Sequence, residues 1–336
     1  MNVRERREAQ EASLLSPYAA HSVHSRGRDR AEPECDVRTV YQRDRDRILH
    51  SKSFRRLKDK TQVFLAPKGD HYRTRLMHTL EVSQTARTIA CALCMNEDLT
   101  EAIALGHDLG HTPFGHTGEA ALNACRPGGF RHNEQSVRTV EVIEKKGRGL
   151  NLTWEVRDGI RNHKTSGNPA TLEGKIVRYS DKIAYVNSDI DDAIRAGILT
   201  EDDLPSEFRR VLGGTSRERL NTLIHDIVDY SRDKNDILMS PSVDQALRGL
   251  RAYMMKHVYH NSIAKEEEAK AVALVKKLYA YYEEHFEELP EHYRALHSPA
   301  AENREQVVCD YIAGMTDRFA IDEYRRLFIP RGWEKR

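Results

Sequence analysis

A short histidine-rich segment carries the side chains in this sequence that are most suited to chemistry. Residues 106–116 contain three histidines, and an aspartate directly follows the first of them: His107, Asp108, His111 and His116. A neutral imidazole beside a carboxylate suits a divalent ion such as Mn²⁺, Mg²⁺ or Fe²⁺. Adjacent residues can bind one ion only if the backbone turns them together, and glycines at positions 106 and 110 permit such close packing. The segment is therefore a candidate metal site.

An isolated His-Asp pair is a weak signal, so residues elsewhere in the chain must support it. His78 lies upstream and Asp181 lies downstream, each within a stretch of helical pattern. All four side chains fall on expected helices or helix ends, and a helical bundle can bring such positions together at one ion. His78, His107, Asp108 and Asp181 therefore form a candidate ligand set.

Helical periodicity dominates the sequence, and the alternation typical of strands is scarce. The most informative helix is expected over about 171–196, where apolar side chains recur at intervals of three and four: Leu172, Ile176, Tyr179, Ile183, Val186, Ile190 and Ile194. This stripe predicts a core face. The other side carries Asp181, Tyr185, Ser188 and Asp192, with Asp189 at its margin. That side fits either a solvated surface or the wall of a pocket.

Further helices are expected before and after the histidine-rich segment, over about 73–94, 98–109, 132–146 and 154–163. Asp98 with Glu101 resembles a capping box, and Thr117 is a candidate cap for another helix that has Glu119 in its first turn. Residues 200–245 mix charges, glycines and prolines, which predicts a loop-rich connector with a short helix. Near the C-terminus, one buried helical stripe is expected: Val307, Tyr311, Met315 and Phe319.

Composition predicts a soluble globular protein, with 39% hydrophobic and 31% charged residues. No stretch approaches the roughly 18 apolar residues that span a bilayer. The charged start of the chain lacks the apolar segment of a signal peptide, so we expect a cytoplasmic location. The five cysteines are expected to be reduced, and Cys91 and Cys94 to be buried structural thiols.

Basic residues crowd together between Arg26 and Lys60, with several acids among them. One interpretation is a solvated, charge-laced surface. The other is a surface for phosphate or for single-stranded nucleic acid. Residues 1–36 are expected to form a flexible charged arm.

Several blocks of the sequence together resemble the HD superfamily, and most closely its deoxyguanosinetriphosphate triphosphohydrolase-like proteins. They are residues 54–64 (FRRLKDKTQVF), the region of His78, residues 107–119, 132–136 (HNEQS), 180–185 (SDKIAY) and 310–317 (DYIAGMTD). Each block alone is weak, but the combination is specific and spans roughly residues 37–330. The resemblance implies an all-α fold, an HD-domain helical bundle with additional C-terminal helices. The expected organisation is the arm at 1–36, a phosphohydrolase core at 37–200 and a helical region at 201–336 packed on the core.

The resemblance also implies roles for individual residues. His78, His107, Asp108 and Asp181 match metal ligands. His116 and Glu119 match a catalytic pair. His111 and His132 match histidines that line the phosphate region. Arg75 and Lys182 match residues that hold the phosphates. Gln62 and Asp189 match groups that contact the sugar 3′-hydroxyl. Tyr185 matches a tyrosine that lies beside the deoxyribose.

The implied reaction is metal-dependent hydrolysis of deoxynucleoside triphosphates to deoxynucleoside and inorganic triphosphate, by a homo-oligomer. A metal ion polarises a phosphoryl oxygen and acidifies bound water, and histidine can protonate the leaving oxygen. Glu119 follows His116 by three residues, so on a helix it can meet the imidazole and favour its protonated form. Two alternatives remain: another HD-type nucleotide phosphohydrolase such as a nucleotidase, and a nucleic-acid-binding regulatory protein with a residual site.

Overall fold

The computed structural model describes residues 1–62, 73–258, 262–298 and 303–330. Its centre is a bundle of five helices: α2 (Val40–Leu49), α4 (Arg75–Ala92), α5 (Glu97–Gly106), α9 (Trp154–Asn162) and α10 (Leu172–Arg195). Within the described residues there is no strand, and only two isolated bridges pair extended backbone. The expected all-α class is confirmed. None of the helices described is long and apolar enough to cross a membrane.

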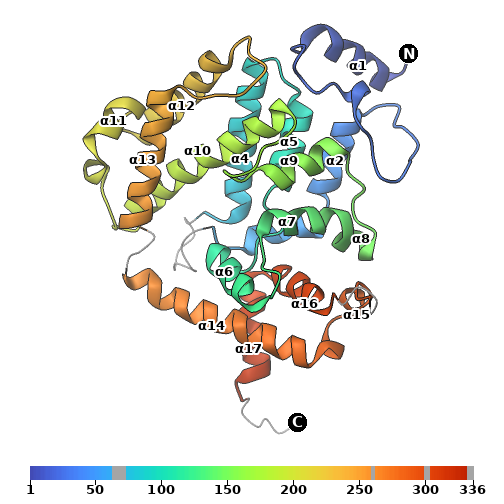
Figure 1. Ribbon diagram of the computed structural model, residues 1–336, viewed down its shortest axis with the longest axis vertical. Helices are drawn as coiled ribbons and strands as arrows, with labels where there is room; N and C mark the ends of the chain where they lie inside the picture. Colours follow the sequence, from blue (N-terminus) through green and yellow to red (C-terminus); the bar gives the residue numbers. More distant parts are fainter. Residues whose placement is uncertain (63–72, 259–261, 299–302, 331–336) are drawn as a thin grey trace.

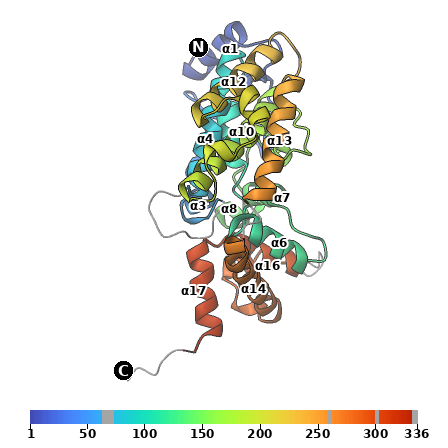
Figure 2. The same ribbon diagram turned by 90° about the vertical axis from the view of Figure 1, so that its left-hand side faces the viewer.

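Further helices lie around this bundle (Figure 1). They are α1 (Val3–Leu14), α3 (Lys52–Arg56), α6 (Gly115–Cys125), α7 (His132–Arg138), α8 (Glu144–Gly147), α11 (Ser206–Leu212), α12 (Ser216–Ser231) and α13 (Pro241–His257). The C-terminal part consists of α14 (Ser262–Glu284), α15 (Glu291–Arg294), α16 (Arg304–Ala313) and α17 (Asp317–Phe328). Figure 2 shows α17 extending away from the body of the molecule.

Helix α10 runs through the bundle as its sequence pattern predicts. Thr171 caps it by accepting a hydrogen bond from the Gly174 backbone. Ile176, Ile183 and Ile190 are fully buried against α4, α5 and α9. Complete burial of one such side chain contributes about 1.5–3 kcal/mol, so this stripe holds the opposite face of α10 in a defined orientation.

The apolar side chains form two clusters. The first fills the bundle and reaches α11, α12 and α13, while the second joins α6 to α14, α16 and α17. Packing therefore does not follow the expected division at residue 200. Helix α6 comes from the middle of the expected core but packs with the C-terminal helices.

The connector expected at 200–245 is largely helical. Helix α12 begins with a capping box in which Thr215 and Glu218 satisfy each other's backbone amides. Leu223 and Ile227 point from it into the first cluster. Most of the charges that suggested a loop lie on its exposed face, but Arg219 is buried and pairs with Glu201.

Residues 1–36 are folded onto the bundle, in contrast to the flexible arm expected. Helix α1 starts with a capping box formed by Asn2 and Glu5. Farther along, the Arg28 side chain forms an ion pair with Asp44, which is fully buried. The Arg26 guanidinium lies 3.6 Å from the centre of the Trp154 ring. The Arg26–Trp154 contact joins residues more than a hundred positions apart, so local composition does not reveal it.

Several expected helix boundaries are wrong. Asn96, not Asp98, caps α5 by accepting from the Leu99 amide. Helix α6 begins before Thr117, at a left-handed Phe114 with φ 63°. The helix expected over 132–146 breaks into α7, a π-helical stretch over residues 139–143, and α8 with two left-handed lysines.

Three side chains expected to be buried are exposed. Cys91 and Cys94 lie at the exposed end of α4. The stripe of α16 ends at Gly314, because Thr316 caps a new helix, and Phe319 on that helix is 46% exposed.

Many of the basic residues between Arg26 and Lys60 form ion pairs within the chain. These ion pairs include Arg28–Asp44, Arg38–Asp46, Arg43–Glu32, Arg45–Asp98 and Arg47–Glu32. This pattern fits the charge-laced surface better than a nucleic-acid surface.

Candidate active site

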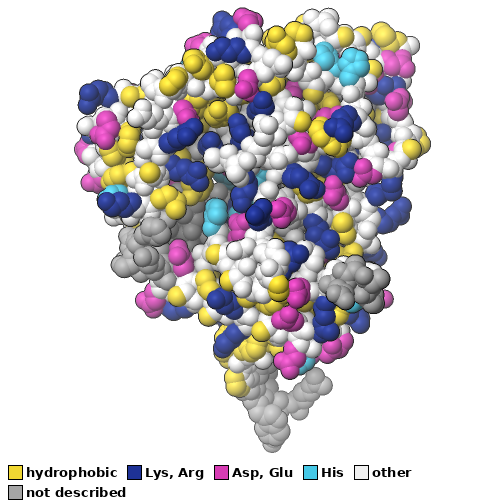
Figure 3. Space-filling model, viewed as in Figure 1, with side chains coloured by type: hydrophobic (Ala, Val, Ile, Leu, Met, Phe, Trp, Pro, Cys, Tyr) yellow, Lys and Arg dark blue, Asp and Glu magenta, His cyan; other side chains and the backbone are white. Residues whose placement is uncertain are grey.

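A pocket opens where α4, α6, α9, α10 and α13 approach one another. In Figure 3, basic side chains surround a hollow of this face in which histidine is visible. Its lining is dominated by histidines and cations: Gln62, Arg75, His78, Asp108, His111, His116, His132, His163, Lys164, Thr165, Asp181, Lys182, Tyr185 and Arg251. Such a lining suits a polyanionic ligand.

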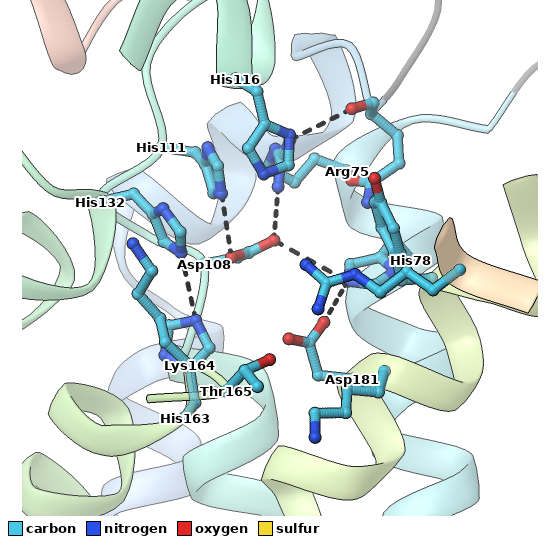
Figure 4. A pocket seen from close by; sticks show the side chains of 14 residues that line it. Arg75, His78, Asp108, His111, His116, His132, His163, Lys164, Thr165 and Asp181 are labelled. Carbon is cyan, nitrogen blue, oxygen red and sulfur yellow. Dashed lines mark hydrogen bonds and ion pairs between the residues drawn. The ribbon is translucent and has the colours of Figure 1, made fainter. Parts of the chain in front are cut away.

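Three of the four candidate metal ligands, His78, Asp108 and Asp181, meet at the floor of this pocket (Figure 4), and the buried His107 lies within 4 Å of both carboxylates. His78 Nε2 lies 3.1 Å from Asp181 Oδ1 and 3.9 Å from Asp108 Oδ2. His107 Nε2 lies 3.5 Å from Asp108 Oδ2 and 3.8 Å from Asp181 Oδ1. The chain thus brings two imidazole nitrogens and two carboxylates together from α4, the end of α5, and α10.

The hydrogen bonding of His107 fits a bound cation. Its Nδ1 lies 2.6 Å from the Ala104 carbonyl oxygen, to which it donates a hydrogen bond. The lone pair is therefore on Nε2, which is buried and has no hydrogen-bond partner among the described residues. A carbonyl that fixes the tautomer of a histidine is typical of metal ligands. This buried cluster can hold a divalent metal ion.

The charges of the cluster favour ionised carboxylates. Burial by itself raises the pKa of Asp108, but His107, His111 and Arg75 together hold it well below its usual range. The pKa of Asp181 is likewise lowered, because the hydrogen bond from His78 and the surrounding imidazoles outweigh burial. Both carboxylates are therefore available as ligands at neutral pH.

Arg75 lies beside this cluster on the first turn of α4. Its Nη1 is 2.5 Å from Asp108 Oδ2, and its Nη2 reaches the backbone carbonyls of Thr61 and Gln62 at 3.4 Å. The guanidinium is almost fully buried. It thus joins the floor of the pocket to the segment that carries Gln62.

Three histidines form one wall of the pocket. The rings of His111 and His132 are stacked with centroids 3.9 Å apart, and the His116 ring lies edge-on to His111 at 5.4 Å. His111 Nε2 approaches Asp108 Oδ1 at 3.4 Å. The wall therefore adjoins the metal cluster directly.

Glu119 hydrogen-bonds to His132, not to His116 as the sequence suggested. Its two oxygens accept from the His132 backbone amide at 2.9 Å and from His132 Nδ1 at 2.8 Å. That hydrogen bond lowers the pKa of Glu119 to about 2 although burial opposes it. The prediction that Glu119 pairs with His116 is therefore wrong, because its hydrogen-bond partner is His132. The spacing of three places both residues on α6, but the packing of α7 brings His132 closer.

Burial lowers the pKa of His116 to about 4, with Arg75 as the next cause. The imidazole is therefore neutral at pH 7 in the free protein, which also differs from the expected protonated form. A polyanion beside Arg75 would favour protonation of this ring.

The expected substrate-binding residues are distributed over two walls. Gln62 is buried and lines the pocket, and the Tyr185 ring lies edge-on to His116 with centroids 6.3 Å apart. Lys182 is at the rim, where burial and the nearby Arg178 lower the pKa of its amine. Asp189 is buried on α10, one turn beyond Tyr185, and is not part of the lining described above.

Four lining residues had no assigned role in the sequence analysis: His163, Lys164, Thr165 and Arg251. His163 Nε2 lies 3.2 Å from His132 Nε2, and burial lowers the pKa of His163 to about 3. The run His163-Lys164-Thr165 ends an expected helix, a position where polar side chains often face a site. Arg251 has no local signal, since only the packing of α13 brings it to the pocket.

Comparison with known proteins identifies the same regions. Residues 75–186 match the HD domain, and residues 237–326 match the phosphohydrolase-associated domain. A deoxyguanosinetriphosphate triphosphohydrolase-like protein of Caldanaerobacter subterraneus is 56% identical over 99% of this chain and 98% of the relative. A protein of the same description from Clostridium perfringens is 49% identical over 98% and 99%. A third, from Desulfatibacillum aliphaticivorans, is 47% identical over the same shares. Among solved structures, a hypothetical protein from Aquifex aeolicus has a TM-score of 0.49 at 20% identity, covering 85% of this chain and 71% of that chain.

Proposed function

Because the chain belongs to the deoxyguanosinetriphosphate triphosphohydrolase-like proteins, which carry an HD domain, we propose that this HD-type phosphohydrolase acts on deoxynucleoside triphosphates. Water attacks the α-phosphorus, the bond to the 5′-oxygen breaks, and deoxynucleoside and inorganic triphosphate leave. The observation that supports this best is the buried His/Asp cluster at the floor of a pocket lined by four cations: Arg75, Lys164, Lys182 and Arg251.

His78, His107, Asp108 and Asp181 would hold the divalent ion. When bound, such an ion polarises a phosphoryl oxygen and supplies a nucleophile near neutral pH. A ligand set of imidazoles and carboxylates accommodates Mn²⁺, Mg²⁺ and Fe²⁺ alike.

The chain's own side chains bind the triphosphate and move the proton. Arg75 and Lys182 offset the phosphate charge, and Lys164 and Arg251 add to this at the pocket wall. His116, protonated once the polyanion is bound, donates its proton to the departing 5′-oxygen. Glu119 fixes His132, and the stacked His132–His111 pair in turn holds His111 against Asp108.

The sugar is assigned to the opposite wall. Tyr185 lies one helical turn after Asp181, so its ring is near the position expected for the deoxyribose. Gln62 and Asp189 are proposed to contact the 3′-hydroxyl. Gln62 lines the pocket, whereas Asp189 is buried outside the lining and would reach the sugar only if the surrounding side chains move. An aromatic ring offers no hydrogen-bond partner to a 2′-hydroxyl, which disfavours ribonucleotides.

Product analysis tests the proposal against the nucleotidase alternative. The four deoxynucleoside triphosphates are incubated with Mg²⁺ or Mn²⁺, and nucleoside, monophosphate, phosphate and triphosphate are quantified. We expect equal amounts of deoxynucleoside and intact triphosphate. Turnover of deoxynucleoside monophosphates with release of single phosphate, without cleavage of triphosphates, would instead establish the nucleotidase. Binding of single-stranded DNA without turnover under any metal would favour the regulatory alternative.

A further inference from the structure

Asp317, at the start of α17, connects two segments of the pocket that are distant in sequence. Its Oδ2 accepts hydrogen bonds from the Thr61 amide at 2.9 Å and from the Thr61 hydroxyl. Its Oδ1 accepts a hydrogen bond from the Phe114 amide at 2.9 Å. One carboxylate therefore joins the backbone directly before Gln62 to the turn directly before His116.

The turn at Phe114 needs such a partner. Phe114 and Gly115 both have left-handed backbone, with φ 63° and 56°, and a left-handed conformation is strained for a bulky residue such as phenylalanine. The Phe114 side chain is buried in the second apolar cluster, which holds the residue in place. Its amide hydrogen bond to Asp317 fixes the orientation of the peptide that leads into α6 and His116.

The two segments also approach each other closely at this point. A Cβ atom added to Gly115 would lie 3.2 Å from the Gln62 carbonyl oxygen and 3.3 Å from Arg75 Nη2. The turn that leads into His116 therefore packs directly against the segment that carries Gln62.

A second contact links the same C-terminal segment to the histidine wall. The fully buried Lys60 amine donates to the His111 carbonyl at 2.5 Å and to the Ala313 carbonyl at 2.7 Å. Lys60 thus links Ala313 to the His111 backbone, and Asp317 binds the backbone at Phe114, two residues before His116. The catalytic side chains come from the HD domain, whereas this anchor comes from the C-terminal region.

We propose that Asp317 is a positioning residue that sets His116 for proton transfer through its contacts with Phe114 and Thr61. The inference rests on the proposed function, because it assigns Asp317 to the step that His116 performs. Displacement of a reacting group by about 1 Å can cost roughly 10²-fold in rate. The carboxylate therefore acts on turnover without contacting the substrate.

The first test is Asp317→Asn. An amide has only one acceptor oxygen, so its NH₂ group faces an N–H donor at either Thr61 or Phe114. We expect kcat to fall roughly 10- to 100-fold, with bound metal retained and KM changed by less than about threefold. Asp322→Asn on the same helix is the control, because Asp322 is exposed and pairs only with Arg318 and Arg325 among the described residues. A parent-like kcat in Asp317→Asn overturns the proposal.

A double-mutant cycle separates positioning from general stability. Because Asp317 acts through His116, adding Asp317→Asn to His116→Ala should lower kcat by less than about twofold. Full additivity of the two losses overturns the proposal. If His116→Ala itself has the parent rate, the proposed function of His116 fails instead, so the two failures are distinguishable.

Thr61→Val gives a milder version of the same test if Asp317→Asn does not fold. It removes only the hydroxyl donor to Asp317 and preserves shape. We expect a roughly 3- to 10-fold lower kcat, the effect of losing one hydrogen bond of ordinary strength, again without effect in the His116→Ala background. An unchanged kcat in this folded variant, or an equal loss in both backgrounds, refutes the positioning role.

Discussion

The pKa values of neighbouring histidines in this pocket are shifted in opposite directions. His78 faces Asp181, whose hydrogen bond and charge raise the imidazole pKa even though burial lowers it. His116 and His163 lack so close a carboxylate, and burial lowers their pKa values. Without an ion, the surroundings therefore favour the protonated imidazole at His78 and the neutral imidazole at His116 and His163. A metal ion at His78 must displace this proton, because only neutral imidazole is a ligand.

The metal cluster predicts the effect of Asp108→Ala. This substitution removes a ligand and leaves Arg75 without its carboxylate partner. We expect loss of bound divalent ion and of measurable turnover, with helix content largely unchanged. Metal analysis together with circular dichroism checks this, and full activity in the variant would refute the metal site.

Because Glu119 contacts His132 and not His116, substitutions of His116 and Glu119 should lower kcat to different extents. His116→Ala should retain metal and lower kcat by roughly 10²- to 10⁴-fold, the usual range for general acid catalysis. Glu119→Gln should cost less, because it perturbs His132 and reaches the reacting atoms only indirectly. Single-turnover rates of both variants test this. A larger loss in Glu119→Gln would show that His132 and not His116 transfers the proton.

Tyr185 predicts the discrimination between sugars. A 2′-hydroxyl against its ring loses water without gaining a partner, which should cost about 1–3 kcal/mol, or roughly 5- to 150-fold in kcat/KM. We expect ribonucleotides to be poor substrates and Tyr185→Ala to narrow the gap. The measurement is the ratio of kcat/KM for the best deoxynucleotide and its ribonucleotide in both proteins. An unchanged ratio contradicts this role.

At the scale of elements, α10 joins the site to the periphery. Its central turns carry Asp181 and Tyr185, and its first turn carries Glu173, which is fully buried. One oxygen of Glu173 accepts hydrogen bonds from the amides of Ala20 and Asn96. The same helix therefore holds the N-terminal residues and the start of α5.

Glu173 makes stability depend on pH in a defined direction. Burial raises its pKa above the ordinary value of 4.5, so its favourable contribution is present below about pH 4.5 and is lost as pH rises through the folded pKa. Glu173→Gln keeps the oxygen that accepts both amides and cannot ionise. We expect the variant to be more stable than the parent at pH 8, with the difference vanishing near pH 4. Thermal unfolding across this range tests it, and a variant less stable at pH 8 contradicts it.

At the scale of the whole molecule, the C-terminal helices complete the HD core. Asp310 on α16 is fully buried and accepts hydrogen bonds from Gln135 and Arg138 on α7, the helix that begins at His132. Gln306 adds a third donor from α16 itself. Together with Asp317, this carboxylate ties the C-terminal region to the histidine wall.

Removing this anchor should destabilise the molecule. Asp310→Ala leaves Gln135 and Arg138 without their acceptor, and loss of one partner of a buried ion pair costs roughly 3–5 kcal/mol. We expect about 3 kcal/mol, the low end, because Arg138 is 24% exposed. Urea unfolding measures it. As a control, Asp229→Ala breaks an exposed pair with Arg232 and should cost less than about 1 kcal/mol. Equal effects of the two substitutions would show that Asp310 is not an anchor.

The sequence by itself determined the helical class and the candidate metal ligands. The stripe of Ile176, Ile183 and Ile190 predicts which side of α10 is buried, and helical spacing then places Asp181 and Tyr185 together on the other side. Such inferences succeed because a helix has a regular geometry, so positions three and four residues apart share a face.

Only the tertiary structure decided which residues of different helices meet. Helix packing angles, not spacing, pair Glu119 with His132, bring Arg251 to the pocket and place Asp317 between Thr61 and Phe114. The folded N-terminal residues depend on Arg28–Asp44 and Glu173 in the same way. These contacts join positions far apart in the chain, and their free energy comes from burial and hydrogen bonding that exist only once the helices have packed.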